Sequence, residues 1–377
     1  IVLIRPTMSY NTDQRTVMTL DAGGTNFVFG AIRGCEEVVE PIHLPSAANN
    51  LELSLANLIN GFHAVRSRLK EPPVAISFAF PGPADYPNGI IWNIGNLPAY
   101  KGGVAVGPML AAEFGIPVFI NNDGDLYAYG EAISGYLPWV NAQLEKAGSP
   151  KRYHNLVGLT LGTGFGGGIV RNGNLFLGDN SAAAEVWLLS QRYHQEQNIE
   201  ESISIRAVRR VYGELTGTPA DHLPTPKDIY EIGIGAKEGD KAAALESFRR
   251  MGQALGDALC NVLTIVDGIA VIGGGVAGAR SLFVPAMMEE IHSHFTGATG
   301  ASFPRLAQKA FYLEDEAQMA EFLQGEVKQI QIPHTTERVT YDSMPRVGIG
   351  FSHIGTSKAI SIGAYAFALS ALDRQAR

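Results

Sequence analysis

Three clusters of glycine, each placed directly after a run of β-type residues, constrain this chain more than any other feature of its sequence. They lie at residues 23–24, 162–168 and 273–275. Glycine makes up 43 of the 377 residues, well above its usual share of about 7%. Without a Cβ, backbone N–H groups can converge on an anion. Tight turns alone could explain one such cluster. They explain three clusters, each after a β-type run, much less well, so the pattern favours phosphate-binding turns.

The first two clusters lie between short apolar runs. Residues 16–20 and 27–32 flank the first cluster, and residues 156–161 and 169–170 flank the second. A third short strand is expected after each pair. This order predicts β-hairpins rather than strand-to-helix turns. Because the plan occurs twice, the sequence suggests two related halves.

Helical patterns separate these strands. Apolar residues repeat at helical spacing over 51–69, with Asn50 as a plausible N-cap, and again over 245–263. The second helix is followed by a short apolar strand at 269–272 and then by the third glycine cluster. Mixed strands and helices indicate an α/β protein.

Two stretches, 137–155 and 333–350, are polar and contain proline and glycine. Such composition is typical of connecting segments rather than of buried strands or helices. We therefore expect loops or insertions at both places and assign no chemistry to them.

Length and charge restrict the class of protein. A chain of 377 residues usually forms more than one domain. The formal charge of −8 argues against nucleic-acid binding, no apolar run is long enough to span a membrane, and residues 1–10 do not look like a signal peptide. Two cysteines, Cys35 and Cys260, exclude a disulfide framework and a four-cysteine zinc site. We expect a soluble, cytoplasmic protein with two domains.

Two segments match the glycine pattern G-x-G-x-x-G of dinucleotide-binding proteins, at 162–167 and 273–278. The first runs into a hairpin, where that fold requires a helix. The second precedes an expected helix at 281–294, but residues 296–302 lack the acidic residue that binds the ribose. A dehydrogenase is therefore not favoured.

The ordered motifs resemble the sugar kinase/Hsp70/actin superfamily and, within it, the ROK family of sugar kinases and related repressors. Residues 21–25, 162–168 and 272–275 look like its phosphate-1, phosphate-2 and adenosine motifs. Further segments resemble the family in the same order: 80–85, 96–98, 117–131, 182–185 and 362–364. The resemblance extends over nearly the whole chain.

The resemblance implies two ribonuclease-H-like domains of the actin-like ATPase fold, with a cleft between them. The first would span 1–122 together with a closing helix at 356–377, and the second would span 123–355. It also implies a homodimer. The implied reaction is ATP-dependent phosphorylation of a hydroxyl group on a hexose or amino sugar.

In such a kinase the two phosphate motifs would hold the β- and γ-phosphates of ATP, and the adenosine motif would lie under the adenosine. Asp21 would lie near Mg²⁺, in part through water, although an Asp at a glycine turn also commonly accepts backbone N–H groups. The implied nucleotide-binding residues are Gly23, Gly24, Thr25, Gly162, Thr163, Gly164, Gly273, Gly274 and Gly275.

Asp123 matches the family's general base, which accepts the proton of the attacking sugar hydroxyl. It stands in an Asn-Asn-Asp run before a helical segment, so it could instead cap that helix. Asp125 is a rival carboxylate. We prefer Asp123 because Asn122 fits beside it as a partner of a sugar hydroxyl.

The resemblance also implies sugar contacts from six residues: Gly82, Asn96, Asn122, Asp123, Glu185 and Glu200. Asn and carboxylate side chains can bind several hydroxyl groups at once. For both glutamates the alternative is a charge exposed to solvent. For Glu200 this alternative is nearly as plausible as a contact with sugar. For Glu185 a site role is favoured because its neighbours are almost all apolar.

The chain departs from the family in one region. Leu188 stands where the family has a histidine, and residues 193–200 contain no cysteine where the family has its zinc loop. We therefore predict no zinc site and leave the identity of the sugar open.

An alternative to the kinase is a sugar-binding sensor or regulator of the same family that does not phosphorylate its ligand. Its DNA-binding form would need a domain before Asp21, where this sequence has 20 residues. Asp123 and all three glycine motifs match the kinases, so phosphoryl transfer is the preferred function.

Overall fold

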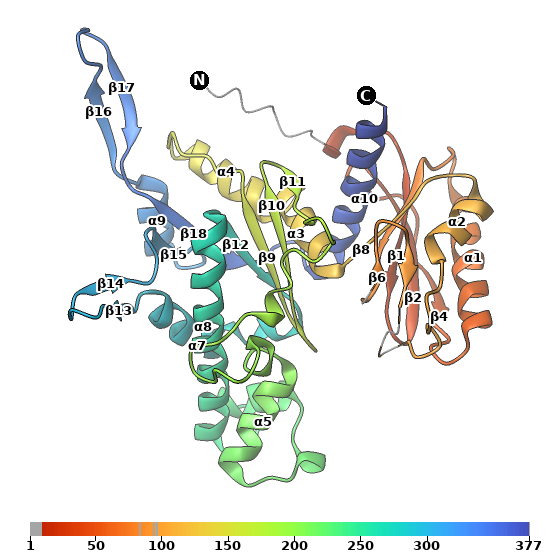
Figure 1. Ribbon diagram of the computed structural model, residues 1–377, viewed down its shortest axis with the longest axis horizontal. Helices are drawn as coiled ribbons and strands as arrows, with labels where there is room; N and C mark the ends of the chain where they lie inside the picture. The colour runs from red at the N-terminus through yellow and green to blue at the C-terminus, as the bar shows by residue number, and fades with distance from the viewer. Residues whose placement is uncertain (1–9, 83, 93–94, 96, 377) are drawn as a thin grey trace. The chain divides into compact units, whose positions relative to one another are not determined.

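Two mixed β-sheets, with helices packed on them, form the frame of the molecule (Figure 1). The computed structural model describes residues 10–82, 84–92, 95 and 97–376. Within these ranges no helix is both long enough and apolar enough to cross a lipid bilayer. The α/β class expected from the sequence is confirmed.

The first sheet has the strand order β3-β2-β1-β5-β8, and β4 also pairs with β2. Strands β1 and β2 form the antiparallel hairpin expected at the first glycine cluster. Strand β5 is parallel to both β1 and β8. The strands are β1 Val17–Ala22, β2 Asn26–Arg33, β3 Glu36–Glu37, β4 Ile42–Pro45, β5 Ala75–Ala79 and β8 Val118–Asn121.

Helices cover both faces of this sheet (Figure 1). α1 (Leu51–Arg68) and α2 (Val106–Phe114) pack on one face, and α10 (Thr356–Gln375) packs on the other. α3 (Asp123–Ile133) lies against α10. As expected, Asn50 caps α1, where its side chain accepts the backbone N–H of Leu53 at 3.1 Å. Short elements complete this part: η1 Tyr10–Thr12, β6 Ala84–Asp85 and β7 Ile90–Ile91.

The second sheet repeats the plan, with the order β11-β10-β9-β12-β18-β15. Strand β12 is parallel to β9 and to β18, and β15 is parallel to β18. Hairpin strands at one side and parallel strands at the other thus occur in both sheets, as the repeated glycine pattern suggested. The strands are β9 Leu156–Leu161, β10 Phe165–Arg171, β11 Asn174–Leu175, β12 Ile269–Gly273, β15 Lys309–Tyr312 and β18 Arg346–Phe351.

Helices α7 and α8 pack side by side and share a large apolar core with this sheet. α5 and α6 pack on α7. The helices are α4 Tyr136–Lys146, α5 Ile205–Thr216, α6 Pro226–Gly233, α7 Lys241–Val266, α8 Arg280–Ile291 and α9 Glu316–Gln324. The short helices are η2 Val186–Leu188, η3 Ile199–Glu201, η4 Ala220–His222 and η5 Gly275–Ala279. Two separate hairpins pair β13 (His294–Thr296) with β14 (Ser302–Pro304), and β16 (Val327–Gln331) with β17 (Arg338–Asp342).

By packing, the chain divides into two compact units. One consists of Ile1–Pro138, Gly168–Ala184 and Ile354–Arg377, and the other of Trp139–Gly167 and Glu185–His353. The first unit includes α3, which follows the domain boundary expected after residue 122. The domain limits expected from the sequence stay a prediction.

The expectation of loops at 137–155 and 333–350 is wrong. α4 covers the first half of the former stretch, and β17 and β18 cover most of the latter. In α4 the buried Tyr136, Val140 and Leu144 follow helical spacing around polar residues. In β18 the glycines at 348 and 350 separate buried apolar residues and hid the strand pattern.

The contact between α3 and α10 depends on two glycines. A Cβ on Gly363 would lie 1.9 Å from the carbonyl oxygen of Leu126, and one on Gly130 would lie 1.8 Å from that of Ala359. The two helix backbones therefore approach more closely than any side chain allows. Because α10 also packs on the first sheet, this contact fixes α3 relative to the strand ends.

Gly363→Ala is expected to lower the thermal unfolding temperature by several degrees, although alanine normally favours a helix. Overpacking of this kind costs about 1–3 kcal/mol. Differential scanning calorimetry measures the effect. Ser357→Ala, at an exposed position of the same helix, is the control and should change little. An unfolding temperature that is unchanged or higher in Gly363→Ala would contradict the close approach.

Candidate functional site

Three of the expected site segments lie at one edge of the first sheet. Asp21 is at the carboxyl end of β1, Gly82 follows β5, and Asp123 follows β8. The register places Asp21 opposite Ala79, and Ala79 opposite Asn121. Because the three strands are parallel, their carboxyl ends meet at this edge, which is where α/β proteins commonly bind ligands.

The turn between β1 and β2 is tightly closed at the same edge. The backbone N–H of Gly23 donates to the carbonyl oxygen of Asn26 at 3.0 Å, and a Cβ on Gly23 would lie 2.9 Å from that oxygen. The hydroxyl of Ser46 donates to the carbonyl oxygen of Gly24 at 2.6 Å, and its backbone N–H to that of Thr25 at 3.0 Å. These bonds hold the backbone of the turn in one conformation.

Asn122 is the N-cap of α3, and its side-chain oxygen accepts the backbone N–H of Gly124 at 2.8 Å. Asp123 is the first residue of the helix, and its Oδ1 accepts the same N–H at 2.8 Å. The cap uses only the amide oxygen of Asn122. Capping and a catalytic role for Asp123 are compatible, because Asn122 supplies the cap and the Gly124 N–H occupies only Oδ1 of Asp123.

The side chain of Asp123 is accessible to solvent. The many protein atoms around it nevertheless reduce its hydration. This partial desolvation raises the pKa of Asp123, and the negative charge of Asp21 raises it further, against the opposing hydrogen bond from Gly124. Desolvation also raises the pKa of Asp21. Raised carboxyl pKa values are typical of groups that accept protons in catalysis. Asp125 differs, since it is 4% exposed within α3.

Gly82 has a packing reason of its own. A Cβ there would lie 2.9 Å from the hydroxyl oxygen of Tyr86, which donates to the carbonyl oxygen of Phe80 at 3.1 Å. Its contact with sugar stays a prediction. Asn96, expected to bind sugar, lies outside the described residues.

In the second unit, Gly162, Thr163 and Gly164 form the turn from β9 to β10. The backbone N–H of Gly162 donates to the carbonyl oxygen of Gly164 at 3.0 Å. A Cβ on Gly162 would have no heavy atom within 4 Å, and its φ is not left-handed. Packing does not require glycine at this position, whereas close approach of a ligand to the backbone would.

Glu200 supports this turn. Its Oε2 accepts the backbone N–H of Phe165 at 2.9 Å and would lie 2.6 Å from a Cβ on Gly164. Its Oε1 pairs with Arg206 at 2.9 Å, and Arg206 also donates to the carbonyl oxygen of Thr163 at 3.3 Å. The structure therefore gives Glu200 a positioning role at the turn. Its expected contact with sugar stays a prediction.

Arg206 is the residue that sequence reasoning missed here. It lies in the first turn of α5, which Ser204 caps by accepting the backbone N–H of Ala207. The capping serine predicts the helix start. No local signal links Arg206 to Thr163, because 43 residues separate them.

The third glycine cluster closes the carboxyl end of β12, next to that of β9. Gly274 has a φ of +88°, and a Cβ there would lie 2.2 Å from the carbonyl oxygen of Leu161. Glycine is therefore required for β12 to end beside β9. A Cβ on Gly275 would meet nothing within 4 Å, so that glycine leaves an open backbone surface. Gly273 pairs with Thr160, which fixes both turns at the same edge of the second sheet.

Glu185 is half-buried, and its carboxylate accepts the indole N–H of Trp187. Leu188, which replaces the family histidine, is 58% exposed. The carboxylate therefore has a neutral partner, and within the described part of the chain it forms no ion pair. Its contact with sugar stays a prediction.

Ion pairs anchor the segment that follows. Arg305, Asp257 and Glu290 form a cluster in which each side chain is at most 5% exposed. Arg192 joins it, since its backbone N–H donates to Asp257 at 3.0 Å and its guanidinium to Glu290 at 3.1 Å. The cluster fixes residues 192–193 to α7 and α8.

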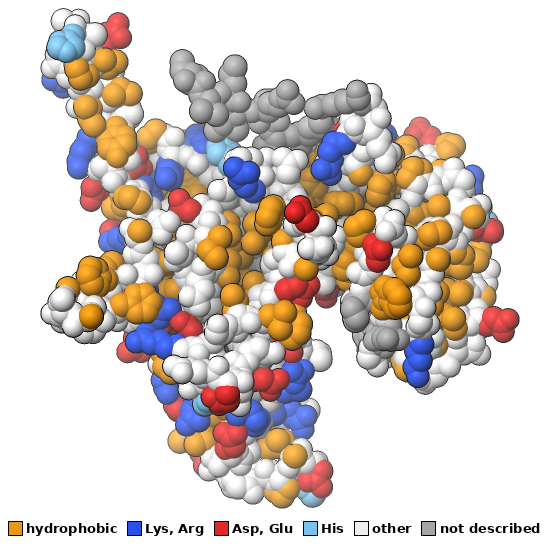
Figure 2. All heavy atoms as spheres, in the orientation of Figure 1, with side chains coloured by type: hydrophobic (Ala, Val, Ile, Leu, Met, Phe, Trp, Pro, Cys, Tyr) orange, Lys and Arg blue, Asp and Glu red, His pale blue; other side chains and the backbone are white. Residues whose placement is uncertain are grey.

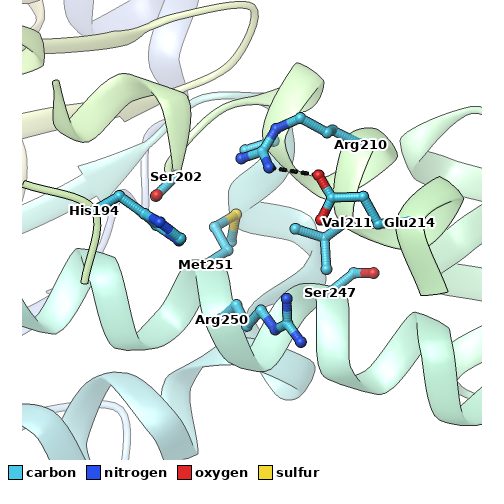
Figure 3. Close-up of a pocket in the computed structure, with 9 residues that line it drawn as sticks. His194, Ser202, Arg210, Val211, Glu214, Ser247, Arg250 and Met251 are labelled. Carbon is cyan, nitrogen blue, oxygen red and sulfur yellow. Dashed lines mark hydrogen bonds and ion pairs between the residues drawn. The ribbon is translucent and has the colours of Figure 1, made fainter. Parts of the chain in front are cut away.

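A small pocket lies beside this segment, between α5 and α7 (Figure 3). Its volume is about 60 Å³, which is too small for a hexose. Among its lining residues, Arg210 pairs with Glu214 at 2.8 Å. Nothing expected from the sequence falls in this pocket.

Among the described residues, no three His, Cys, Asp or Glu side chains gather as a metal site would require. Mg²⁺ bound with a nucleotide usually takes only one or two carboxylates and keeps several waters. Asp21 and Asp123, close enough to interact electrostatically, fit that kind of site. The absence of zinc stays a prediction.

Comparison with known proteins adds independent evidence. A model of the ROK family matches residues 17–317. The crystal structure of a glucokinase from Parabacteroides distasonis is 49% identical, with a TM-score of 0.87 over 96% of this chain and 99% of that one. An N-acetyl-D-glucosamine kinase from Vibrio parahaemolyticus is 26% identical over 75% of this chain and 97% of its own length.

A ROK family glucokinase from Streptomyces griseus, solved with glucose and AMPPNP, shares the fold. Its TM-score is 0.57 at 16% identity, over 93% of this chain and 98% of that one. These matches extend along most of the chain, and the range of the family model includes all three glycine clusters. The chain therefore belongs to the ROK family, has the actin-like ATPase fold of its kinases, and is a sugar kinase.

Proposed function

We propose that this kinase transfers the γ-phosphoryl group of ATP to a hydroxyl group of a hexose, with Asp123 as the general base. The observation that carries the proposal is the exposed carboxylate of Asp123, with its raised pKa, at the edge where β1, β5 and β8 end. A carboxylate within hydrogen-bond reach of a hydroxyl group can accept its proton as that oxygen attacks.

In the proposed reaction the sugar oxygen forms a bond to the γ-phosphorus while the bond from that phosphorus to the β–γ bridging oxygen breaks. The hydroxyl proton passes to a carboxylate oxygen of Asp123, and ADP leaves. Bound Mg²⁺ supplies neutralisation of phosphate charge. Asp21 would face it, directly or through water. Asn122 would orient the hydroxyl through its side-chain nitrogen, and Gly82, Asn96 and Glu185 would contact the sugar.

The nucleotide would bind through backbone groups. The open Cβ positions of Gly162 and Gly275 support this role, because they leave the backbone accessible. The N–H groups of Gly23 and Gly162 bond within their own turns. Gly24 and Thr25 in the first turn, and Thr163 and Gly164 in the second, would donate N–H groups to phosphate oxygens. Gly273, Gly274 and Gly275 would lie under the adenosine.

Glucose is the first candidate substrate, since the glucokinase from Parabacteroides distasonis is 49% identical to this chain over nearly all of both proteins. Curated glucokinases and N-acetyl-D-glucosamine kinases are both about 26% identical to it. An amino sugar is the second candidate, because Leu188 replaces a side chain expected near the sugar. Coupled ADP release with Mg-ATP over glucose, mannose, N-acetylglucosamine and N-acetylmannosamine distinguishes them. The homodimer implied by the sequence stays a prediction at this point.

Asp123→Asn is expected to lower kcat with the preferred sugar by about 10²- to 10⁴-fold, because asparagine cannot accept the proton. ATP affinity, measured by calorimetric titration, should remain. Asp125→Asn is the matched comparison, and its turnover should stay well above that of Asp123→Asn. If Asp125→Asn were the inactive variant, the assignment of the base would be wrong.

The pH profile gives a second readout of the same base. In the wild type, kcat/KM should fall as the pH drops through the raised pKa of Asp123 and protonates it. The residual activity of Asp123→Asn should lack this acidic limb. An acidic limb that is identical in both proteins would assign it to another group.

Glu200→Gln is expected to raise the KM for ATP by roughly tenfold or more, because hydrogen bonds to a charged partner contribute about 1.5–3 kcal/mol. The KM for sugar should change less. Glu201→Gln is the control, since Glu201 is more exposed and contacts Arg206 alone in this network, at 3.2 Å. A rise confined to the KM for sugar would instead support Glu200 as a sugar ligand.

A further inference from the structure

A second cavity adjoins the small pocket between α5 and α7. Its volume is about 250 Å³, and the two cavities share His194, Ser202 and Arg250 in their walls. Since a water molecule occupies about 30 Å³ in the liquid, the second cavity has room for roughly eight waters. It is therefore large enough for a small organic molecule. We call the two cavities together the basic cavity.

The charged side chains that line the basic cavity are mostly positive. They are Arg210, Arg249 and Arg250, against the single carboxylate of Glu214. Figure 2 shows Lys and Arg side chains gathered over the region of α5 and α7, with acidic side chains among them. Each of the three arginines is 39–49% exposed, so a ligand can reach its guanidinium group. A positive cavity on a chain with a formal charge of −8 indicates a site for an anion.

The ion pairs of α7 leave positive charge at this cavity. Glu246 accepts a hydrogen bond from Nε of Arg249 at 2.6 Å and another from Nε of Arg250 at 2.8 Å. The bonds from Arg249, and to a smaller extent from Arg250, outweigh desolvation and lower the pKa of Glu246 to about 2. Glu246 is therefore ionised near pH 7. A single carboxylate nevertheless neutralises only one of two guanidinium groups.

Arg250 presents hydrogen-bond donors that the protein does not use. Glu246 engages only its Nε. Within the described part of the chain, the two terminal nitrogens of this guanidinium group form no hydrogen bond. Two neighbouring N–H donors of a guanidinium group match two oxygens of a phosphoryl group. Arg250 can thus bind an anion without breaking its pair with Glu246.

Two further side chains reach the cavity from other elements. Figure 3 shows Arg210 on α5, Arg250 on α7 and His194 in the segment before η3 around one pocket. Arg210 pairs with Glu214 at 2.8 Å, one turn further along α5, and both groups are partly exposed. Such a pair contributes little, so an anion can compete with Glu214 for Arg210. The ring of His194 is exposed and, among the described residues, forms no hydrogen bond.

The wall of the cavity is held in place by polar contacts. The hydroxyl of Ser202 donates to the side-chain oxygen of Gln191 at 2.7 Å, and the side-chain nitrogen of Gln191 donates to the carbonyl oxygen of Asn198 at 2.9 Å. Arg210 also donates to the carbonyl oxygen of Glu201 at 2.8 Å. These bonds tie residues 191–202 together, so the cavity is formed before a ligand binds. Preorganisation of this kind lowers the cost of binding.

We propose that the basic cavity binds a small phosphate monoester, whose phosphoryl oxygens accept hydrogen bonds from Arg250 and Arg210. The phosphoryl group supplies the negative charge that Glu246 alone does not provide, and His194 lies beside it. The remaining volume, next to Gln253, accommodates a short carbon chain with hydroxyl groups. The proposal is independent of the proposed reaction, because none of these residues takes part in it.

Calorimetric titration with glycerol 3-phosphate tests the proposal. Mg²⁺ and a non-hydrolysable ATP analogue are present to occupy the proposed nucleotide site, and the measurement requires no turnover. We expect one site per chain. Arg250→Gln should weaken binding by about tenfold or more, because hydrogen bonds to a charged group are lost. An absence of binding to the wild type, or equal binding to Arg250→Gln, would overturn the proposal.

Lys241→Gln is the matched control. It removes the same charge from an exposed position at the start of the same helix, and it should bind glycerol 3-phosphate like the wild type. Thermal unfolding checks that both variants are folded. A loss of affinity in Lys241→Gln as large as in Arg250→Gln would assign binding to the general charge of α7 and contradict a site at Arg250.

Glu246→Gln gives a result that damage to the fold cannot imitate. The substitution removes the carboxylate that competes with the ligand for Arg249 and Arg250. Affinity for glycerol 3-phosphate should therefore rise severalfold. An affinity that is unchanged or lower in this variant would contradict the proposed role of the uncompensated charge.

Two further probes test the chemical class of the ligand. Glycerol, which has no phosphoryl group, should not bind. Inorganic phosphate should bind more weakly than glycerol 3-phosphate, because it does not fill the part of the cavity next to Gln253. Binding of glycerol, or binding of inorganic phosphate at least as tight as that of the ester, would overturn the assignment of a phosphate monoester.

Discussion

The parallel pairing of β1, β5 and β8 is the constraint on which the first half of the candidate site depends. It brings the segments after residues 22, 79 and 121 to one edge of a sheet. The register Asp21–Ala79–Asn121 aligns the ends of the strands. The helix contact through Gly130 and Gly363 then fixes α3. Asp123 thus owes its position to backbone pairing and helix packing more than to contacts of its own side chain.

The second sheet applies the same constraint to the nucleotide motifs. Its parallel strands β9 and β12 end side by side, and Gly274 is required for that approach. Glycine is present in this sheet for two different reasons. Gly274 satisfies the packing of the protein itself, whereas Gly162 and Gly275 leave open backbone that packing does not explain. The second kind is the better evidence for a ligand.

Local patterns in the sequence predicted the strands around each glycine cluster and the main helices, because apolar spacing and turn residues act over short distances. They also predicted a cap in the Asn-Asn-Asp run, without deciding which residue forms it. Contacts distant in sequence were not predictable: Glu200 reaches Phe165 and Arg206 reaches Thr163 across 35 and 43 residues. The sequence predicted a loop over 333–350, where β17 lies, because polar residues alternate with apolar ones along that strand.

A crystal structure with glucose and a non-hydrolysable ATP analogue would test the central claim, that Asp123 activates the sugar hydroxyl, most directly. The account predicts one sugar hydroxyl oxygen about 2.6–3.2 Å from a carboxylate oxygen of Asp123, with phosphate oxygens on the backbone of residues 162–164. Sugar bound with no hydroxyl group near Asp123, or with Asp125 as its nearest carboxylate, would contradict it.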